Sequence, residues 1–126
     1  MKRVVAAFLL LSTAVALAVW SGITYQSKMG GLEKQLEDLV ICAQNGSDDE
    51  IKSQTEKLTA EWKSSSELLH SLVVHEGMDD LEETITSLPL LLEHSTKEEF
   101  IKVCIEAINL IENLTESERL NIGNIL

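Results

Sequence analysis

The stretch HSLVVHEGMDD, residues 70 to 80, gathers the side chains of this chain that are best suited to chemistry. Imidazole nitrogens and carboxylate oxygens bind divalent cations and exchange protons near neutral pH. His70 and His75 are five residues apart, which places them about 140° from each other on a helix of 100° per residue. One helical face therefore cannot present both histidines to a metal ion.

A turn at Gly77 gives this stretch two competing interpretations. His75 with Asp79 or Asp80 could converge across the turn, and Glu76 would add an oxygen, which would form a cation site or a proton-linked switch. In the structural interpretation, His75 lies in the last turn of one helix, Gly77 ends that helix and Asp79 caps the next. We favour the structural interpretation and assign no metal ligand.

Two cysteines, Cys42 and Cys104, fall on the apolar faces of predicted helices. A pair outside the cytoplasm permits a disulfide, which requires α-carbons within about 7 Å. Buried free thiols are the alternative, and we favour them. Two cysteines so far apart in sequence match no metal or thioredoxin-type motif.

Motifs of catalysis do not occur in the sequence, which has no phosphate-binding glycine loop, nucleophile elbow or zinc-protease motif. His94, with Glu93 and Ser95 beside it, falls at a helix junction where capping residues are expected. We therefore expect no enzyme, and we assign no catalytic residue, no cofactor-binding residue and no cofactor.

An uncharged segment, residues 4–27, follows Lys2 and Arg3 at the N-terminus. Its 24 residues would reach about 36 Å as a helix, enough to cross a hydrocarbon layer of about 30 Å. Residues 1–27 are therefore predicted to be a transmembrane anchor. The positive-inside tendency places the N-terminus in the cytoplasm and the rest of the chain outside.

A cleaved signal peptide is the alternative for this segment. Small residues at Ala14 and Ala16, or at Ala16 and Ala18, could form a cleavage site. We favour the uncleaved anchor because the apolar run continues past both sites and ends in Trp20 and Tyr25, which we interpret as a pair of aromatic residues at the membrane interface.

Residues 28–126 are predicted to form an acidic, extracytoplasmic helical domain. They hold all 21 acidic residues and eight of the ten basic ones, a net charge of 8 − 21 = −13, which disfavours binding to nucleic acids. Apolar residues alternate at spacings of three and four in four segments. The expected helix boundaries are Gly46 after the first, Ser47 and Gly77 around the second, Asp79 before the third, and Ser95 before the fourth.

Short connections between these segments make neighbouring helices antiparallel. The fold class is therefore all-α, with an N-terminal transmembrane helix followed by a small antiparallel bundle of three to four helices. We expect a kink or break at Pro89, and a hinge between the anchor and the bundle at Gly30 and Gly31.

The order of these features resembles an uncharacterised bacterial family of small single-pass membrane-anchored helical proteins, catalogued as a domain of unknown function. The resemblance rests on the N-terminal anchor, Trp62, the run SLVVHEGMDDLEETI and the ending ESERLNIGNIL, and it covers essentially the whole chain. It implies a single-pass protein with an extracytoplasmic helical domain and brings no activity with it. The resemblance also implies that the genes of relatives often lie beside the gene of another uncharacterised membrane protein. This arrangement suggests a membrane-protein partner.

Two functions are consistent with these features. The favoured one is a membrane-anchored, extracytoplasmic interaction module, an accessory subunit of a membrane or envelope complex, because an anchor and a bundle occur without a catalytic motif. The alternative is an extracytoplasmic sensor or binder of cations or protons, which rests on the charge of −13 and the His75, Glu76, Asp79 and Asp80 corner.

Overall fold

Four α-helices make up the chain in the computed structural model, which describes residues 1–72 and 77–125, with the backbone alone described for residues 72 and 121–125. The helices are α1 (Lys2–Asn45), α2 (Asp48–Leu72), α3 (Gly77–His94) and α4 (Lys97–Ile125). The described residues contain no strand, so the predicted all-α fold class is confirmed.

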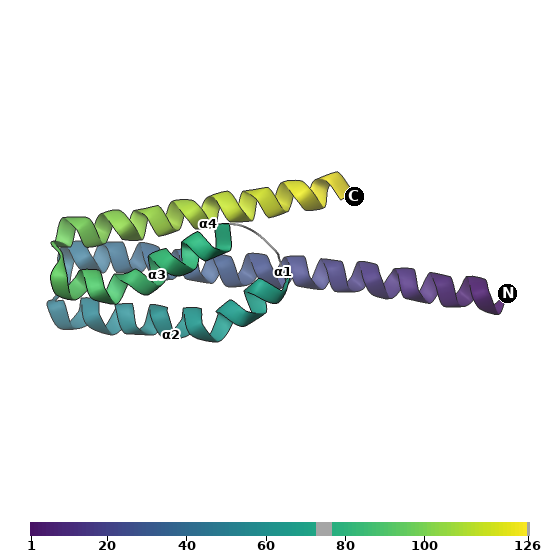
Figure 1. Cartoon of the computed structure of the whole chain (residues 1–126), viewed down its shortest axis with the longest axis horizontal. Coiled ribbons are helices and arrows are strands. Elements are labelled where there is room, and N and C mark those ends of the chain that lie inside the picture. The colour runs from purple at the N-terminus through teal and green to yellow at the C-terminus, as the bar shows by residue number, and fades with distance from the viewer. Residues whose placement is uncertain (73–76, 126) are drawn as a thin grey trace.

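The second half of α1 packs with the other three helices in an antiparallel bundle (Figure 1). Helices that follow one another in the chain pack side by side, α1 with α2, α2 with α3 and α3 with α4. The bundle is closed by contact between α4 and α1. The side-chain amide of Gln26 on α1 donates to the backbone carbonyl of Thr115 on α4 at 3.2 Å. This bond links the first helix of the bundle to the last.

Each helix has a stripe of buried residues that follow one another at alternating spacings of three and four. Such a period of 3.5 residues keeps one stripe facing the bundle axis when helices cross at about 20°. The buried stripes are Gly22, Tyr25, Met29, Leu32, Leu36, Leu39 and Ala43 on α1, Ile51, Thr55, Leu58, Trp62, Ser65 and Leu69 on α2, Met78, Leu81, Ile85 and Leu88 on α3, and Phe100, Cys104, Ala107, Ile111 and Leu114 on α4.

The first half of α1 projects from the bundle without contacting another helix (Figure 1). Residues 2–20 are all exposed, and this is the one helix of the described chain that is long and apolar enough to cross a membrane. A signal sequence would have the same composition and position.

Two sequence predictions for α1 were wrong. The helix continues through Gly30 and Gly31 without a break, so the predicted hinge is not present. Tyr25 does not lie beside an exposed Trp20 as an interfacial residue; it is fully buried in the bundle, because it occupies the first large position of the buried stripe. The bundle therefore begins within the segment that composition assigns to the anchor.

The ends of α1 and α2 follow the predicted capping pattern. The backbone N–H of Gly46 donates to the Cys42 carbonyl at 2.6 Å, which ends α1. The hydroxyl of Ser47 accepts from the backbone N–H of Glu50 at 3.3 Å, which caps α2.

The boundaries of α3 and α4 differ from the predictions. α3 is described from Gly77, so this glycine lies in the third helix and Asp79 is not its first residue, whereas the predicted end of α2 just before Gly77 lies outside the described residues. The cap of α4 is Thr96, whose hydroxyl accepts from the Glu99 N–H at 3.2 Å, and not Ser95. A capping box can be read from either residue because both are followed three positions later by glutamate.

Pro89 lies inside α3, which continues to His94, so of the predicted kink or break the break does not occur. A proline inside a helix removes one backbone donor and costs about 3 kcal/mol. The neighbouring Leu88 is fully buried, and Leu91 and Leu92 pack against the same core. These contacts on both sides of the proline hold α3 against the bundle.

Candidate functional site

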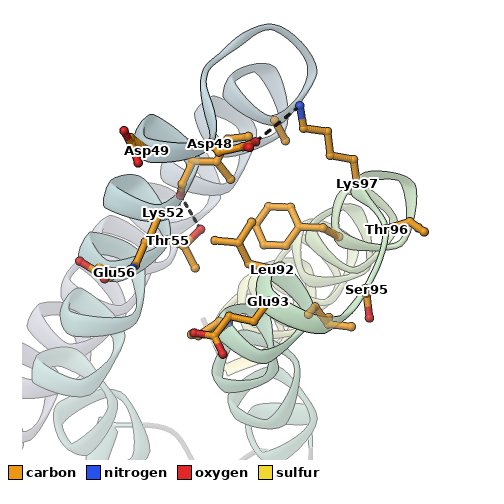
Figure 2. Close-up of a pocket in the computed structure, with 15 residues that line it drawn as sticks. Asp48, Asp49, Lys52, Thr55, Glu56, Leu92, Glu93, Ser95, Thr96 and Lys97 are labelled. Carbon is orange, nitrogen blue, oxygen red and sulfur yellow. Dashed lines mark hydrogen bonds and ion pairs between the residues drawn. The ribbon is translucent and has the colours of Figure 1, made fainter.

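A groove of about 450 Å³ opens at the end of the bundle that lies away from the projecting half of α1. It lies where α1 ends, α2 begins and α3 passes into α4, and we call it the distal groove (Figure 2). Its lining residues are Ala43, Asp48, Asp49, Ile51, Lys52, Thr55, Glu56, Pro89, Leu91, Leu92, Glu93, Ser95, Thr96, Lys97 and Phe100.

The deep part of the distal groove is apolar. Ile51 and Phe100 are each only 1% exposed, and Leu92 points into the groove from α3 (Figure 2). Thr55 also lines this part, but its hydroxyl donates to the Ile51 carbonyl at 2.7 Å. The hydroxyl proton is therefore already used within α2.

The rim of the distal groove is mainly acidic. The lining residues there include four with carboxylates and two lysines, namely Asp48, Asp49, Glu56 and Glu93 with Lys52 and Lys97. One lysine, Lys97, forms an ion pair with Asp48 at 4.0 Å across the start of α4 and α2 (Figure 2). An apolar floor beneath a net negative rim suits a segment that carries both apolar and basic side chains.

Sequence reasoning did not find the distal groove. One signal was present: the run Leu90, Leu91 and Leu92 after Pro89 offers more leucines than one face of a helix can bury. In the structure Leu90 is 64% exposed, and Leu91 and Leu92 are half-buried.

A second group of polar side chains lies at the opposite end of the bundle. His70 in the last turn of α2 meets Asp79 and Glu82 in the first turns of α3, and we call these three residues the corner cluster. One ligand atom from each lies within 4.8 Å of those of the other two, and His70 Nε2 is 4.0 Å from Glu82 Oε2.

The corner cluster differs from the predicted corner of His75, Glu76, Asp79 and Asp80. His75 and Glu76 lie outside the described residues, and Asp80 is exposed and not part of the cluster. His70 belongs to the corner cluster, although the prediction from the sequence did not include it among the corner residues. The histidine spacing tested only one helical face, whereas the structure brings His70 to α3 from a different helix.

A pair of carboxyl groups, Glu33 on α1 and Glu112 on α4, lies between the first and last helices. The pKa of Glu33 is raised, first by burial, then by a side-chain hydrogen bond to Glu112, and then by the negative charges of Glu112 and Glu37. A hydrogen bond between two carboxyl groups requires a proton on one of them. This pair can therefore take up a proton on acidification.

Both cysteines are buried free thiols. Burial raises the pKa of Cys104 to about 12, so this thiol stays protonated at neutral pH and is a poor nucleophile.

The fold and these sites define the class of the protein as an antiparallel four-helix bundle whose first helix extends into an exposed apolar segment. A family model described as a domain of unknown function (DUF4363) matches residues 19–125, and the chain belongs to this family. No curated protein and no solved structure matches the sequence. The predicted resemblance to an uncharacterised family is thus confirmed, and any function must be argued from the sites themselves.

Proposed function

We propose that this protein is a membrane-anchored, extracytoplasmic interaction module that docks another membrane or envelope protein through the distal groove. The distal groove is the observation that supports this function best, because it combines a buried apolar floor with a charged rim at the free end of the bundle. Binding, and not catalysis, is the activity that such a surface suits.

The anchor in this proposal is the first half of α1. Its apolar residues are exposed along their whole length, and a membrane would remove this surface from water. Lys2 and Arg3 before it favour a cytoplasmic N-terminus, which leaves the bundle and its acidic residues outside.

The partner segment that fits the groove is amphipathic and basic. Ile51, Leu92 and Phe100 would contact its apolar side chains, and the carboxylates of the rim would attract its lysines or arginines. Oppositely charged rims mainly raise the rate of association and select the partner, while the apolar contacts supply most of the affinity.

Photocrosslinking in native membranes tests this function. A photoreactive amino acid is placed at Glu56 or Glu93 on the groove rim, with Glu61 and Glu106, which are exposed acidic residues outside the groove, as matched controls. We expect one discrete crosslinked protein from the rim positions and none from the controls.

Charge reversal tests the proposed chemistry of the partner. The double substitution Asp49→Lys with Glu56→Lys should abolish the crosslink formed from Glu93, whereas Glu61→Lys should leave it unchanged. Both rim residues are exposed, so the bundle should stay folded, at a cost of about 0.3 to 1 kcal/mol for placing a lysine in the first turn of α2. Equal crosslinking from the rim and control positions, or a rim crosslink that survives charge reversal, would contradict docking in the distal groove.

Sensing of cations or protons is the second candidate function, and two observations favour it. The corner cluster brings an imidazole and two carboxylates together, and the pair of Glu33 and Glu112 can hold a proton between two helices. The melting temperature of the protein with calcium, zinc, or a change from pH 7.5 to 5.5 tests this function. No response beyond that of exposed-charge controls would contradict it.

A further inference from the structure

We propose that the corner cluster is a binding site for a divalent transition-metal ion of the zinc type, held by His70 Nε2 and by one carboxylate oxygen each of Asp79 and Glu82. The site would join the end of α2 to the start of α3. It is independent of docking in the distal groove, which lies at the other end of the bundle, and it would give the cation-binding alternative a defined set of ligands.

The ligand atoms lie close to the distances that a metal ion requires. Zinc binds imidazole nitrogen and carboxylate oxygen at about 2.0 to 2.2 Å, so two of its ligand atoms are about 3.3 Å apart in a tetrahedral site. His70 Nε2 and Glu82 Oε2 are 4.0 Å apart, and all three ligand atoms lie within 4.8 Å of one another. Small rotations of these side chains can close this difference, since Asp79 is exposed and His70 and Glu82 are half-buried.

The positions of the ligands on the helices favour a common centre. Asp79 and Glu82 are three residues apart, so they project from the same face of α3. His70 approaches this face from the last turn of α2, so the three ligands come from two helices. A metal ion bound here would oppose separation of the two helix ends.

The negative charge of the corner cluster also favours the binding of a cation. Two carboxylates converge at the corner, and within the described residues no lysine or arginine forms an ion pair with either of them. His70 is the one described partner of the Glu82 carboxylate, at a distance of 4.0 Å. A divalent ion would compensate both negative charges at once.

The donor set selects the class of metal. Calcium and magnesium prefer oxygen ligands alone and higher coordination numbers, whereas an imidazole nitrogen with two carboxylates suits zinc and neighbouring transition metals. Three protein ligands leave a fourth position for water or for a side chain of a partner.

Zinc binding to the full chain in detergent micelles tests the proposal. A competition titration against a chromophoric chelator gives the affinity for zinc, with calcium and magnesium as comparison ions. We expect zinc to bind at a ratio of one ion per chain and to raise the melting temperature, while calcium and magnesium at the same concentration do neither.

Substitutions distinguish a specific site from a diffuse acidic surface. His70→Gln, Asp79→Asn and Glu82→Gln should each weaken zinc binding at least tenfold. Asp80→Asn and Glu83→Gln are the matched controls, since each removes one exposed carboxylate one residue further along α3. The controls should change the affinity less than threefold.

Two results would overturn the proposal: equal weakening by the ligand and control variants, or zinc binding that survives His70→Gln. The melting temperature of each variant without zinc shows whether it is folded, and His94→Gln controls for the loss of a histidine outside the cluster. Crosslinking from the distal groove does not depend on any of these results, so failure of the metal site would leave the docking function to its own test.

Discussion

At Gly46 the turn between α1 and α2 leaves no space for a side chain. Its backbone angles, φ −91° and ψ 173°, are accessible to any residue, so conformation does not require glycine here. A Cβ atom would instead lie 2.7 Å from the Cys42 carbonyl oxygen and 2.9 Å from Cys42 Sγ. The first of these is a backbone atom, which cannot move without shifting the end of α1.

The first prediction follows from this crowding. Gly46→Ala should destabilise the protein by about 1 to 3 kcal/mol, the usual cost of overpacking. Gly30→Ala and Gly31→Ala are the contrasting controls, because a Cβ at either position meets nothing within 4 Å and alanine improves helix propensity by up to about 1 kcal/mol. Urea unfolding of the three variants measures the difference, and a stabilising Gly46→Ala would show that the turn is not crowded.

The second prediction concerns the raised pKa of Glu33. A carboxyl group whose pKa is higher in the folded state stabilises that state when protonated, and the contribution is lost as pH rises through the folded pKa. Burial and the negative charges of Glu112 and Glu37 all disfavour the charged form of Glu33 in the folded state. Glu33→Gln should therefore raise the melting temperature at pH 7.5 and reduce the gain in stability on acidification.

Glu116→Gln on α4 is the matched control for this prediction, since it removes one exposed negative charge one helical turn beyond Glu112. Thermal unfolding from pH 7.5 to pH 4 compares the two variants. If both change the pH dependence equally, the effect belongs to the overall charge and not to the carboxyl pair.

At the scale of the helices, α2 depends on Trp62, which is only 1% exposed and has the largest buried side chain of the described chain. Its indole Nε1 is buried without a hydrogen-bond partner. The ring thus contributes through its apolar contacts, while the unpaired N–H reduces that contribution by about 1 to 3 kcal/mol.

The third prediction separates these two effects. Trp62→Ala should cost about 3 to 5 kcal/mol, because it leaves a large cavity in the core. Trp62→Phe should cost much less, because it keeps an aromatic ring and removes the unpaired donor. Denaturant unfolding followed by far-ultraviolet dichroism gives both values, and similar costs for the two variants would contradict this prediction.

The periodic part of the fold could be predicted from the sequence, and the parts made by contacts between helices could not. The stripes through Leu32 and Trp62 repeat at spacings of three and four, and this pattern alone places them in the core. The corner cluster joins His70 to Glu82 across two helices, and the distal groove is lined by residues from Ala43 to Phe100. Neither arrangement has a local pattern, since each depends on the relative rotation and register of the helices.

Single residues with two roles caused the errors along α1. Tyr25 suits a membrane interface as well as a core, and its place in the buried stripe of α1 decides between the two. Glycines indicate hinges in general, but Gly30 and Gly31 lie on the exposed side of a helix whose neighbours Met29 and Leu32 are fully packed. Packing on both sides keeps the helix continuous.

For the whole molecule, the fourth prediction is an uncleaved anchor with the bundle outside the cytoplasm. Mass spectrometry of the protein extracted from membranes should give a chain that still contains Lys2 and Arg3. Protease added to intact cells should remove the acidic domain, and the same protease acting on lysed cells provides the control for accessibility. A mature N-terminus at Val19 would show that the segment is a cleaved signal peptide.

The unbroken course of α1 has a geometric consequence for any partner. Residues 28–45 form a straight continuation of the apolar segment, about 27 Å long at 1.5 Å per residue. With the apolar half in a membrane, α1 fixes the distance of the distal groove from the membrane surface. It also fixes the direction in which the groove opens, measured as a rotation about the α1 axis. One residue inserted into α1 before Gly22, where the buried stripe begins, would turn the groove by about 100° relative to the membrane segment, whereas seven would raise it by about 10 Å and nearly restore its direction. Recognition would then depend on helical phase as much as on the residues that line the groove.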